Sequence, residues 1–268
     1  MNLAINGRSA YISTLGRDIE PTKPSIVFIH GAAMDHTVWT LFARYFLRHG
    51  YNSLAVDLPG HGRSEGPALT KVEDLSQWVD GVIAAAKLEH AIVVGHSLGS
   101  LVAFDLAATT NRVTALGLVG VAMPMPVADV LLNAAKENHH DGLDMVNVWG
   151  HSPRAHIGGF AAPGMWMSGA QLRLLERAGP GVLFADLSAC NAYTGGLDKA
   201  EGLRCPVRFV LGDRDMMTPP RATRTLREKL PNAQVSLLKD CGHALMSERP
   251  NEVLDALVIL ATEQRQAA

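Results

Sequence analysis

The sequence lacks the features that mark exported, membrane-spanning and nucleic-acid-binding proteins. No stretch comes near the roughly 18 consecutive apolar residues of a membrane-spanning helix. The opening MNLAINGRSAYIS has no basic start followed by an apolar run, so we expect no leader peptide. The 24 Lys and Arg residues are spread along the chain and nearly balance the 26 Asp and Glu residues. Without a basic cluster, neither nucleic acid nor a membrane is an expected partner, and we expect a soluble, cytoplasmic protein.

Cysteine is also scarce. Cys190, Cys205 and Cys241 are odd in number, lie far apart and form no C-x-x-C pair. This pattern argues against a disulfide framework and is typical of reduced thiols in a cytosol. The histidine-rich stretch 139–156 has no carboxylate or thiol spacing that matches a zinc site. We therefore expect no metal and no other cofactor.

Short apolar runs, by contrast, are abundant and alternate with amphipathic stretches. With 268 residues, 47% of them apolar, the chain can bury the core of one α/β domain with an insertion. Strands are expected at 25–30, 52–57, 90–95, 113–120, 205–212 and 233–238, and helices at 38–49, 72–88, 98–109 and 221–230. This alternation predicts an α/β fold with a mostly parallel sheet and helices on both faces.

The two ends and the middle of the chain complete the expected fold. Residues 3–6 and 10–14 are expected to form a hairpin that brings the sheet to eight strands, and residues 251–262 a closing helix. After residue 120 the alternation stops, and the sequence becomes rich in Met, Trp, His and Gly, with helical stretches. We therefore predict a core domain of residues 1–120 and 204–268, with residues 121–203 inserted as a helical lid.

Ser97 lies where a predicted strand gives way to a predicted helix, in the stretch VVGHSLGSLVAF. Gly95 and Gly99 remove the side chains that would clash as the backbone doubles back, so the Ser97 hydroxyl is lifted onto the carboxyl edge of the sheet. The backbone N–H of Leu98 points to the same space at the helix N-terminus, where the dipole favours negative charge. The stretch predicts a nucleophile elbow.

A serine nucleophile needs a base and a group that orients the base. The segment GDRDMMTP places Asp213 and Asp215 after one predicted strand, and KDCGHALMSERP places His243 after the next. Taken singly, an Asp near a turn is usually a cap, and a lone His is usually a packing or surface residue. Their succession after neighbouring strands, downstream of the elbow, favours a Ser-His-Asp triad.

These segments resemble the α/β-hydrolase superfamily across nearly the whole chain. The order Ser97, Asp215, His243 is that of the superfamily, and the resemblance implies Asp215 rather than Asp213 as the acid. In the same way HGAAMDHTVW resembles the oxyanion loop of the superfamily, which implies Ala32 as an oxyanion donor beside Leu98.

Two further points of the resemblance bear on function. The segment DLPGHGRS, residues 57–64, resembles a signature loop that is structural rather than catalytic. Serine at position 97 disfavours the branches that use an aspartate nucleophile, haloalkane dehalogenases and epoxide hydrolases.

The expected function is hydrolysis of a small to medium, largely apolar carboxylic ester through an acyl-enzyme. The substrate is expected to contact large apolar side chains of the lid, namely Met123, Met125, Trp149 and Trp166, with Met145, Met165 and Met167 as further candidates. The alternative for most of these side chains is that they pack the lid onto the core.

Other functions share these residues and stay open at this point. The same triad serves enzymes that cleave lactones or carbon–carbon bonds beside a ketone, hydroxynitrile lyases and perhydrolases. A different class is a ligand receptor of the same fold with slow or single-turnover hydrolysis, and sustained turnover separates an enzyme from it. The sequence also leaves a homodimer open.

Overall fold

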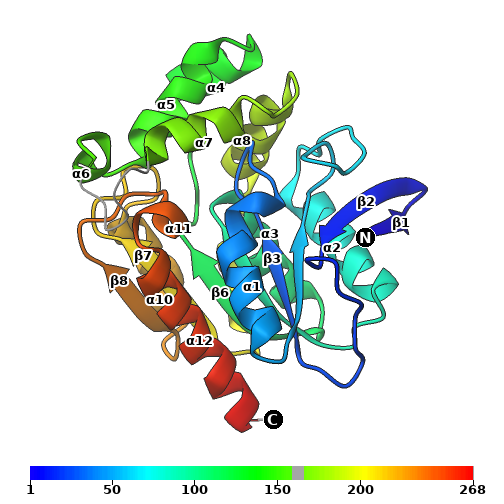
Figure 1. The fold of residues 1–268 in the computed structure, drawn as a ribbon. Helices are drawn as coiled ribbons and strands as arrows, with labels where there is room; N and C mark the ends of the chain where they lie inside the picture. Colours follow the sequence, from blue (N-terminus) through cyan, green and yellow to red (C-terminus); the bar gives the residue numbers. More distant parts are fainter. Residues whose placement is uncertain (159–165, 268) are drawn as a thin grey trace.

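The computed structural model describes residues 1–158 and 166–267, and an eight-stranded sheet runs through its centre (Figure 1). The strands are β1 (Asn2–Ile5), β2 (Arg8–Ser13), β3 (Ser25–Ile29), β4 (Asn52–Val56), β5 (Ala91–His96), β6 (Val113–Val119), β7 (Val207–Gly212) and β8 (Gln234–Leu238). Their order is β1-β2-β4-β3-β5-β6-β7-β8, with β1–β2 and β2–β4 antiparallel and the other pairs parallel. The predicted mostly parallel sheet is confirmed.

Helices cover both faces of this sheet. Outside the segment between β6 and β7, they are η1 (His36–Trp39), α1 (Thr40–Arg48), α2 (Val72–Ala85), α3 (Leu98–Thr109), η3 (Pro220–Thr223), α10 (Arg224–Lys229), α11 (Leu245–Glu248) and α12 (Pro250–Ala267). In β3, Val27 and Ile29 join the core beneath α2 and α3, whereas Ile26 and Phe28 join the core beneath α1 and α12. Because successive strand side chains point to opposite faces, a strand covered on both sides is one continuous apolar run.

Residues 121–203, which we call the inserted segment, lie between β6 and β7. The described part forms α4 (Asp129–Lys136), α5 (His140–Gly150), α6 (Pro153–His156), α7 (Met167–Leu175), α8 (Val182–Ala192), α9 (Gly196–Lys199) and η2 (Ala200–Gly202). Figure 1 shows α4, α5, α7 and α8 gathered beyond one end of the sheet. No helix in the described ranges is long and apolar enough to cross a membrane.

The inserted segment has a small hydrophobic core of its own, separate from the two cores that flank the sheet. It contains Leu131, Ala135, Val146, Leu175, Leu183 and Leu187 from the segment, with Ala33 and Met34 from the loop after β3. The inserted helices therefore pack around part of a loop that the sheet presents to them.

Candidate active site

Ser97 occupies the sharp turn between β5 and α3. Its backbone has φ 54° and ψ −118°, a combination that residues with a side chain seldom adopt. The Ser97 N–H donates to the carbonyl of Val119, 2.9 Å away in the next strand. A Cβ atom on Gly95 would lie 1.9 Å from the Gly99 carbonyl oxygen, and one on Gly99 would lie 2.4 Å from that of Ile29. Only glycine fits two residues before and two residues after the serine, as expected from the sequence.

His243 and Asp215, which follow β8 and β7, meet beside this turn. The His243 Nδ1 atom donates to Asp215 Oδ2 at 2.8 Å. The Thr218 hydroxyl donates to the same oxygen at 2.7 Å and lies 3.1 Å from Nδ1. Since both neighbours of Nδ1 are oxygens, and the hydroxyl gives its proton to the carboxylate, Nδ1 carries the ring proton. The other ring nitrogen, Nε2, is left with a free lone pair and can act as a base.

Asp215 is held ionised in a buried position. Burial by itself would raise the pKa of this carboxyl, but the charge of His243 and hydrogen bonds from His243 and Thr218 bring it below its ordinary value. Backbone N–H groups of Met217 and Thr218 donate to Oδ1 at 2.9 and 2.7 Å. Asp213 instead accepts from the N–H of Cys241 at 3.2 Å. The acid beside His243 is Asp215, and Asp213 ties the two loops together.

His96 connects the serine turn to the His243 loop. It is fully buried, and its Nε2–H donates to the His243 carbonyl at 2.9 Å. Burial, with a smaller contribution from the charge of His243, lowers the pKa of His96 to about 3, so the ring is neutral at neutral pH. Because His96 directly precedes Ser97, this hydrogen bond ties the backbone of His243 to the serine turn.

Two backbone N–H groups near Ser97 are free to bind a ligand. Among the described residues, neither the N–H of Ala32 nor that of Leu98 has a hydrogen-bond acceptor. Leu98 is the first residue of α3, where the helix dipole favours negative charge. Ala32 lines the same cavity as Ser97.

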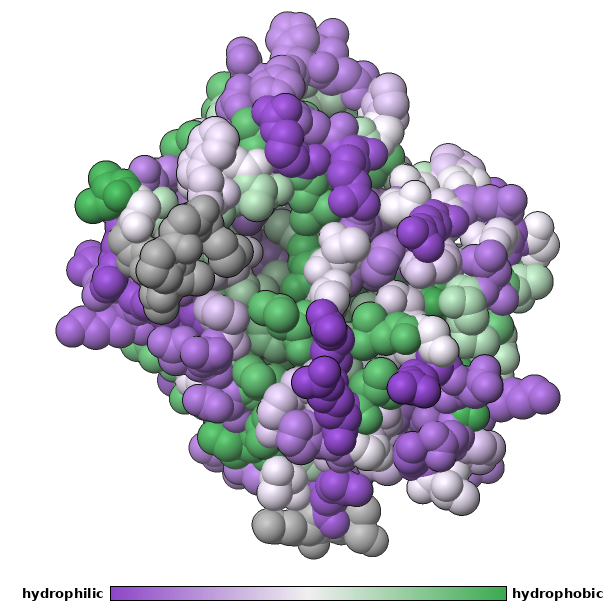
Figure 2. All heavy atoms as spheres, in the orientation of Figure 1, coloured by the Kyte–Doolittle hydropathy of each residue, from purple (hydrophilic) through white to green (hydrophobic). Residues whose placement is uncertain are grey.

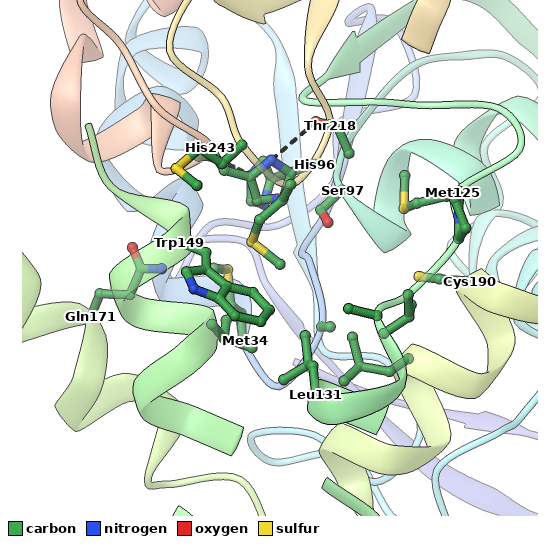
Figure 3. A pocket seen from close by; sticks show the side chains of 18 residues that line it. Met34, His96, Ser97, Met125, Leu131, Trp149, Gln171, Cys190, Thr218 and His243 are labelled. Atoms are coloured by element: carbon green, nitrogen blue, oxygen red, sulfur yellow. Dashed lines mark hydrogen bonds between the residues drawn. The ribbon is translucent and has the colours of Figure 1, made fainter. Parts of the chain in front are cut away.

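A cavity of about 270 Å³ opens beside Ser97 and His243. Its walls are Ala32, Met34, His96, Ser97, Met125, Pro126, Val127, Ala128, Leu131, Val146, Trp149, Gln171, Leu187, Cys190, Met216, Met217, Thr218 and His243. Figure 3 shows Trp149 and Gln171 on one side, Met125 and Cys190 on the opposite side, and Ser97 between them. Among the described residues, no Asp, Glu, Lys or Arg lines this cavity. It suits an uncharged, apolar group.

A groove of about 630 Å³ adjoins this cavity on the surface, between α7, η1 and α11. The two share Met34, His96 and Gln171 as lining residues. Figure 2, in the orientation of Figure 1, shows a hollow near the centre of the molecule, with hydrophobic residues at its edge. The groove and the cavity are therefore neighbours, and the lining of the groove includes Arg173, Arg177 and Glu248 beside apolar side chains.

Comparison with known proteins identifies the family. A family model described as the alpha/beta hydrolase family matches residues 26–256. The chain belongs to this family. It is 30% identical over 248 residues to a pimeloyl-[acyl-carrier protein] methyl ester esterase of Aromatoleum aromaticum, which covers 86% of this chain and 95% of the relative.

Other similar proteins agree with the family assignment. Monoacylglycerol lipase ABHD6 of Bos taurus is 24% identical over 88% of this chain and 74% of its own length. The crystal structure of the enol-lactonase from Burkholderia xenovorans LB400 superposes with a TM-score of 0.83 at 21% identity, covering 98% of this chain and 100% of the other. This alpha/beta hydrolase has the fold of these proteins, and its curated relatives are esterases and other hydrolases, which supports a hydrolase activity.

Of the four lid side chains expected at the substrate, this alpha/beta hydrolase brings two into the cavity. Met125 and Trp149 line it. The expectation for Met123 and Trp166 is corrected, because neither lines the cavity in the described part of the chain. Met123 is buried in the core beneath α3. Trp166 is 76% exposed, with its ring over Gly169 one turn along α7.

The other methionines named from the sequence have varied positions. Met145 packs against the core of the inserted segment, Met167 lines the adjoining groove, and Met165 lies outside the described residues. Met216 and Met217, from the loop after β7, line the cavity although the sequence analysis did not select them. The apolar walls thus come from the sheet loops as well as from the inserted segment.

One group of described residues has the composition of a metal site: Asp35, His36 and Asp57, with possible ligand atoms within 4.8 Å of one another. The oxygens of these carboxylates already accept hydrogen bonds. Asp57 Oδ1 accepts from His36 N at 2.7 Å and from His36 Nδ1 at 2.8 Å, and Oδ2 accepts from Arg63 N at 2.9 Å. Asp35 caps η1 through the N–H of Thr37. This group orders the loops after β3 and β4.

Three polar residues of the site were missed by the sequence analysis: Thr218, His96 and Gln171. Thr218 and His96 lie inside motifs that the analysis quotes. A hydroxyl residue three positions after an aspartate is a common turn partner, and this was the available signal for Thr218. Gln171 lies on α7, and no pattern in the sequence distinguishes it from other helical polar residues.

Proposed function

We propose that this chain is a serine hydrolase that cleaves a small to medium, largely apolar carboxylic ester through an acyl-enzyme. The observation that carries the proposal is the 2.8 Å Asp215–His243 hydrogen bond at the wall of an apolar cavity that also contains Ser97. The hydrogen bond pairs a base with an orienting carboxylate, and Ser97 lines the same cavity as the base, which is the arrangement that a serine nucleophile requires.

The first half of the reaction forms the acyl-enzyme. His243 Nε2 takes the proton from Ser97 Oγ as that oxygen attacks the ester carbonyl carbon. The positive charge that develops on the imidazole is stabilised by Asp215, whose carboxylate is ionised. The carbonyl oxygen becomes an oxyanion, which the N–H groups of Ala32 and Leu98 bind. His243 then gives its proton to the leaving alkoxide, and the alcohol departs.

The second half releases the acid. Water takes the position of the alcohol, His243 removes its proton, and the resulting oxygen attacks the acyl carbon. Collapse of the tetrahedral intermediate returns the proton to Ser97 and frees the carboxylic acid. By analogy with measured deletions, each oxyanion donor supplies about 3 to 4 kcal/mol of transition-state stabilisation. The inserted segment acts in this proposal as a lid that excludes water from the apolar cavity.

The substrate class follows from the cavity and from the relatives. Burying a charged acyl group against uncharged walls costs several kcal/mol, whereas each buried methylene contributes about 0.8 kcal/mol. A neutral apolar acyl chain therefore fits this cavity better than an acyl chain that carries a charge. The two curated relatives named above are an esterase for a methyl ester and a monoacylglycerol lipase, and both names support ester hydrolysis.

The decisive experiment is a series of p-nitrophenyl esters of graded chain length, with burst kinetics. We expect sustained turnover after the burst, and the replacement Ser97→Ala lowers kcat by about five to six orders of magnitude. The matched control is Ser53→Ala, which removes a buried serine hydroxyl on β4 outside the cavity. A fluorophosphonate is expected to label Ser97 once per chain. A burst without turnover indicates the receptor class, and labelling elsewhere contradicts the assignment of Ser97.

A further inference from the structure

A buried carboxylate of the inserted segment binds the loop that contains the proposed oxyanion donor Ala32. Asp186, in the middle of α8, is fully buried. Its Oδ2 atom accepts from the N–H of Ala33 at 2.8 Å and from His61 Nε2 at 2.8 Å. These partners lie 153 and 125 residues away in the sequence. One carboxylate oxygen thus joins the inserted segment to the loops after β3 and β4.

The Ala33 end of this bridge holds a strained residue. Ala33 has φ 54°, in the left-handed region that residues with a Cβ avoid. The N–H of Ala33 belongs to the peptide group between Ala32 and Ala33. The N–H of Ala32, one peptide group earlier, is the oxyanion donor of the proposed function. The hydrogen bond from Ala33 to Asp186 therefore restrains the conformation that sets the direction of the Ala32 N–H.

At the His61 end of the bridge, both ring nitrogens face an oxygen. Nδ1 lies 3.1 Å from the Pro59 carbonyl, and Nε2 lies 2.8 Å from Asp186 Oδ2. Both contacts are to oxygens, so a protonated ring can donate to each of them. Burial lowers the pKa of His61, but the charge and hydrogen bond of Asp186 outweigh it, and the pKa is raised overall.

Other charged and titratable groups also face His61. The ring of His30 lies 4.8 Å from it, between centroids, and Asp57 adds a further favourable charge. Across a cavity of about 60 Å³ lie Asp35 and Arg177, which pair with each other at 2.6 Å. Because these two charges offset one another, Asp186 is the dominant partner of His61.

The second oxygen of Asp186 argues against a purely structural tie. Among the described residues, Asp186 Oδ1 has no hydrogen-bond partner although it is buried. An unsatisfied buried polar atom is costly, so an apolar contact would join α8 to the two loops at lower cost. A hydrogen-bond acceptor at this position is better explained by the N–H of Ala33 that it binds.

We propose that Asp186 is a positioning residue, which acts through Ala33 to hold the oxyanion donor of Ala32 in place while His61 holds Asp186. This proposal rests on the proposed function. It makes the oxyanion hole dependent on the inserted segment, because α8 and the loop after β3 are joined at this point.

The test compares Asp186→Ala with a second tie between the inserted segment and the sheet domain. The Tyr193 hydroxyl donates to Asp105 Oδ1 of α3 at 2.9 Å in a buried position, away from the oxyanion loop, so Tyr193→Phe is the matched control. In Asp186→Ala the donor is displaced rather than deleted, so we expect kcat on p-nitrophenyl butyrate to fall about 10- to 100-fold, below the effect of deleting a donor. KM is expected to change by less than about threefold, since the donor acts in the transition state.

A transition-state analogue gives a readout that loss of stability alone does not move. A trifluoromethyl ketone forms an oxyanion on Ser97, and its affinity is expected to fall by the same factor as kcat/KM in Asp186→Ala. Tyr193→Phe is expected to lower the melting temperature while leaving both quantities within about twofold, because the lost hydrogen bond contributes to stability and does not contact the oxyanion loop.

The variant Asp186→Asn covers the case in which Asp186→Ala does not fold. Its amide oxygen can accept from Ala33, and its NH₂ can donate to a neutral His61. We expect kcat near the wild-type value at pH 7. In the wild type, the ion pair is present below the raised pKa of His61 and is lost as the pH rises through it. The wild-type kcat is therefore expected to decline at alkaline pH, and Asp186→Asn is expected to lack this decline.

The outcomes separate this proposal from the proposed function. If the wild type hydrolyses no ester, the proposed function fails. If the wild type is active but Asp186→Ala keeps its kcat and analogue affinity within twofold, or Asp186→Asn keeps the same alkaline decline, Asp186 is only a structural tie and the positioning proposal is overturned.

Discussion

The sheet loops and the inserted segment supply different parts of the candidate site. The loops after β3, β5, β7 and β8 supply Ala32, Ser97, Asp215 and His243, and each is fixed by hydrogen bonds or by close backbone approach. The inserted segment supplies cavity-lining side chains such as Trp149 and Leu131, and its Asp186 binds the loop after β3. In the proposed function, the sheet edge therefore supplies the groups that react, and the inserted helices select which apolar group enters.

The largest expected effect lies at the sheet edge. Asp215→Asn keeps the shape of the loop but loses the charge that fixes the His243 tautomer, so kcat is expected to fall about 10⁴-fold. The matched variant is Asp213→Asn, two residues away, which weakens the contact with Cys241. It is expected to lower the melting temperature more than the rate. Ester kinetics and thermal unfolding of both variants check this, and the opposite pattern would make Asp213 the orienting acid.

The next effect lies in the inserted segment and concerns selectivity. Met125→Ala and Trp149→Ala enlarge the cavity beside Ser97, so longer acyl chains are expected to gain relative to short ones. The ratio of kcat/KM between chain lengths is expected to shift by a factor of about 10 to 200 for each methylene-sized contact. Labelling of Ser97 by a small fluorophosphonate is expected to stay nearly unchanged. A flat chain-length profile in both variants would assign these side chains to packing alone.

A smaller effect is expected at the sheet loops, where pH changes the stability of the fold. His30 is buried at the end of β3, where Nδ1 donates to Gly31 O at 2.8 Å and Nε2 accepts from Leu58 N at 3.1 Å. Burial, with the nearby charge of His61, lowers its pKa from the ordinary 6.5 to about 4. Below pH 6.5 the unfolded chain therefore binds a proton that the folded chain does not, and stability falls as the pH falls.

This sensitivity to acid can be measured by urea unfolding between pH 6.5 and 4.5. His30 is expected to contribute a slope of about 1.4 kcal/mol per pH unit, and His30→Gln is expected to remove that share. The comparison uses slopes, because the variant also changes the absolute stability. Parallel slopes in wild type and variant would show that His30 titrates alike in the folded and unfolded chains.

The smallest effect is expected at Trp166, and it defines the limit of the substrate region. The side chain is exposed and outside the cavity. Trp166→Ala is therefore expected to leave the chain-length profile within about twofold, and to change stability by no more than about 0.5 kcal/mol, as is usual at the surface. Chain-length kinetics run in parallel with Trp149→Ala provide the check. A shift as large as that of Trp149→Ala would extend the substrate site to the N-terminus of α7.

The sheet could be predicted because its signal is local. Buried parallel strands are short apolar runs, and the glycines around Ser97 mark the turn that follows β5. Helix α8 could not be predicted in the same way. It is buried on several sides, with Val182, Leu183, Leu187 and Cys190 around its circumference, so its sequence lacks a single apolar stripe.

The parts of the site that could not be predicted depend on contacts between segments that are distant in the sequence. The sequence shows that Met123 and Met125 are both large and apolar, but not that both pack into the core while only Met125 also lines the cavity. In the same way, nothing near His61 in the sequence indicates a partner 125 residues away. Such side-chain directions are set by tertiary packing, which local periodicity does not encode.

The small core shared by the inserted helices and the loop after β3 has a consequence for protein engineering. Ala33 and Met34 belong to this core although they lie far from residues 121–203 in the sequence. A chimera that takes only residues 121–203 from a homologous hydrolase would pack the helices of that hydrolase against the loop of this chain. Voids or clashes in such a core typically cost about 1 to 3 kcal/mol or more of folding stability. The unit to transplant is therefore discontinuous, and recombination breakpoints should carry residues 31–36 together with the inserted helices.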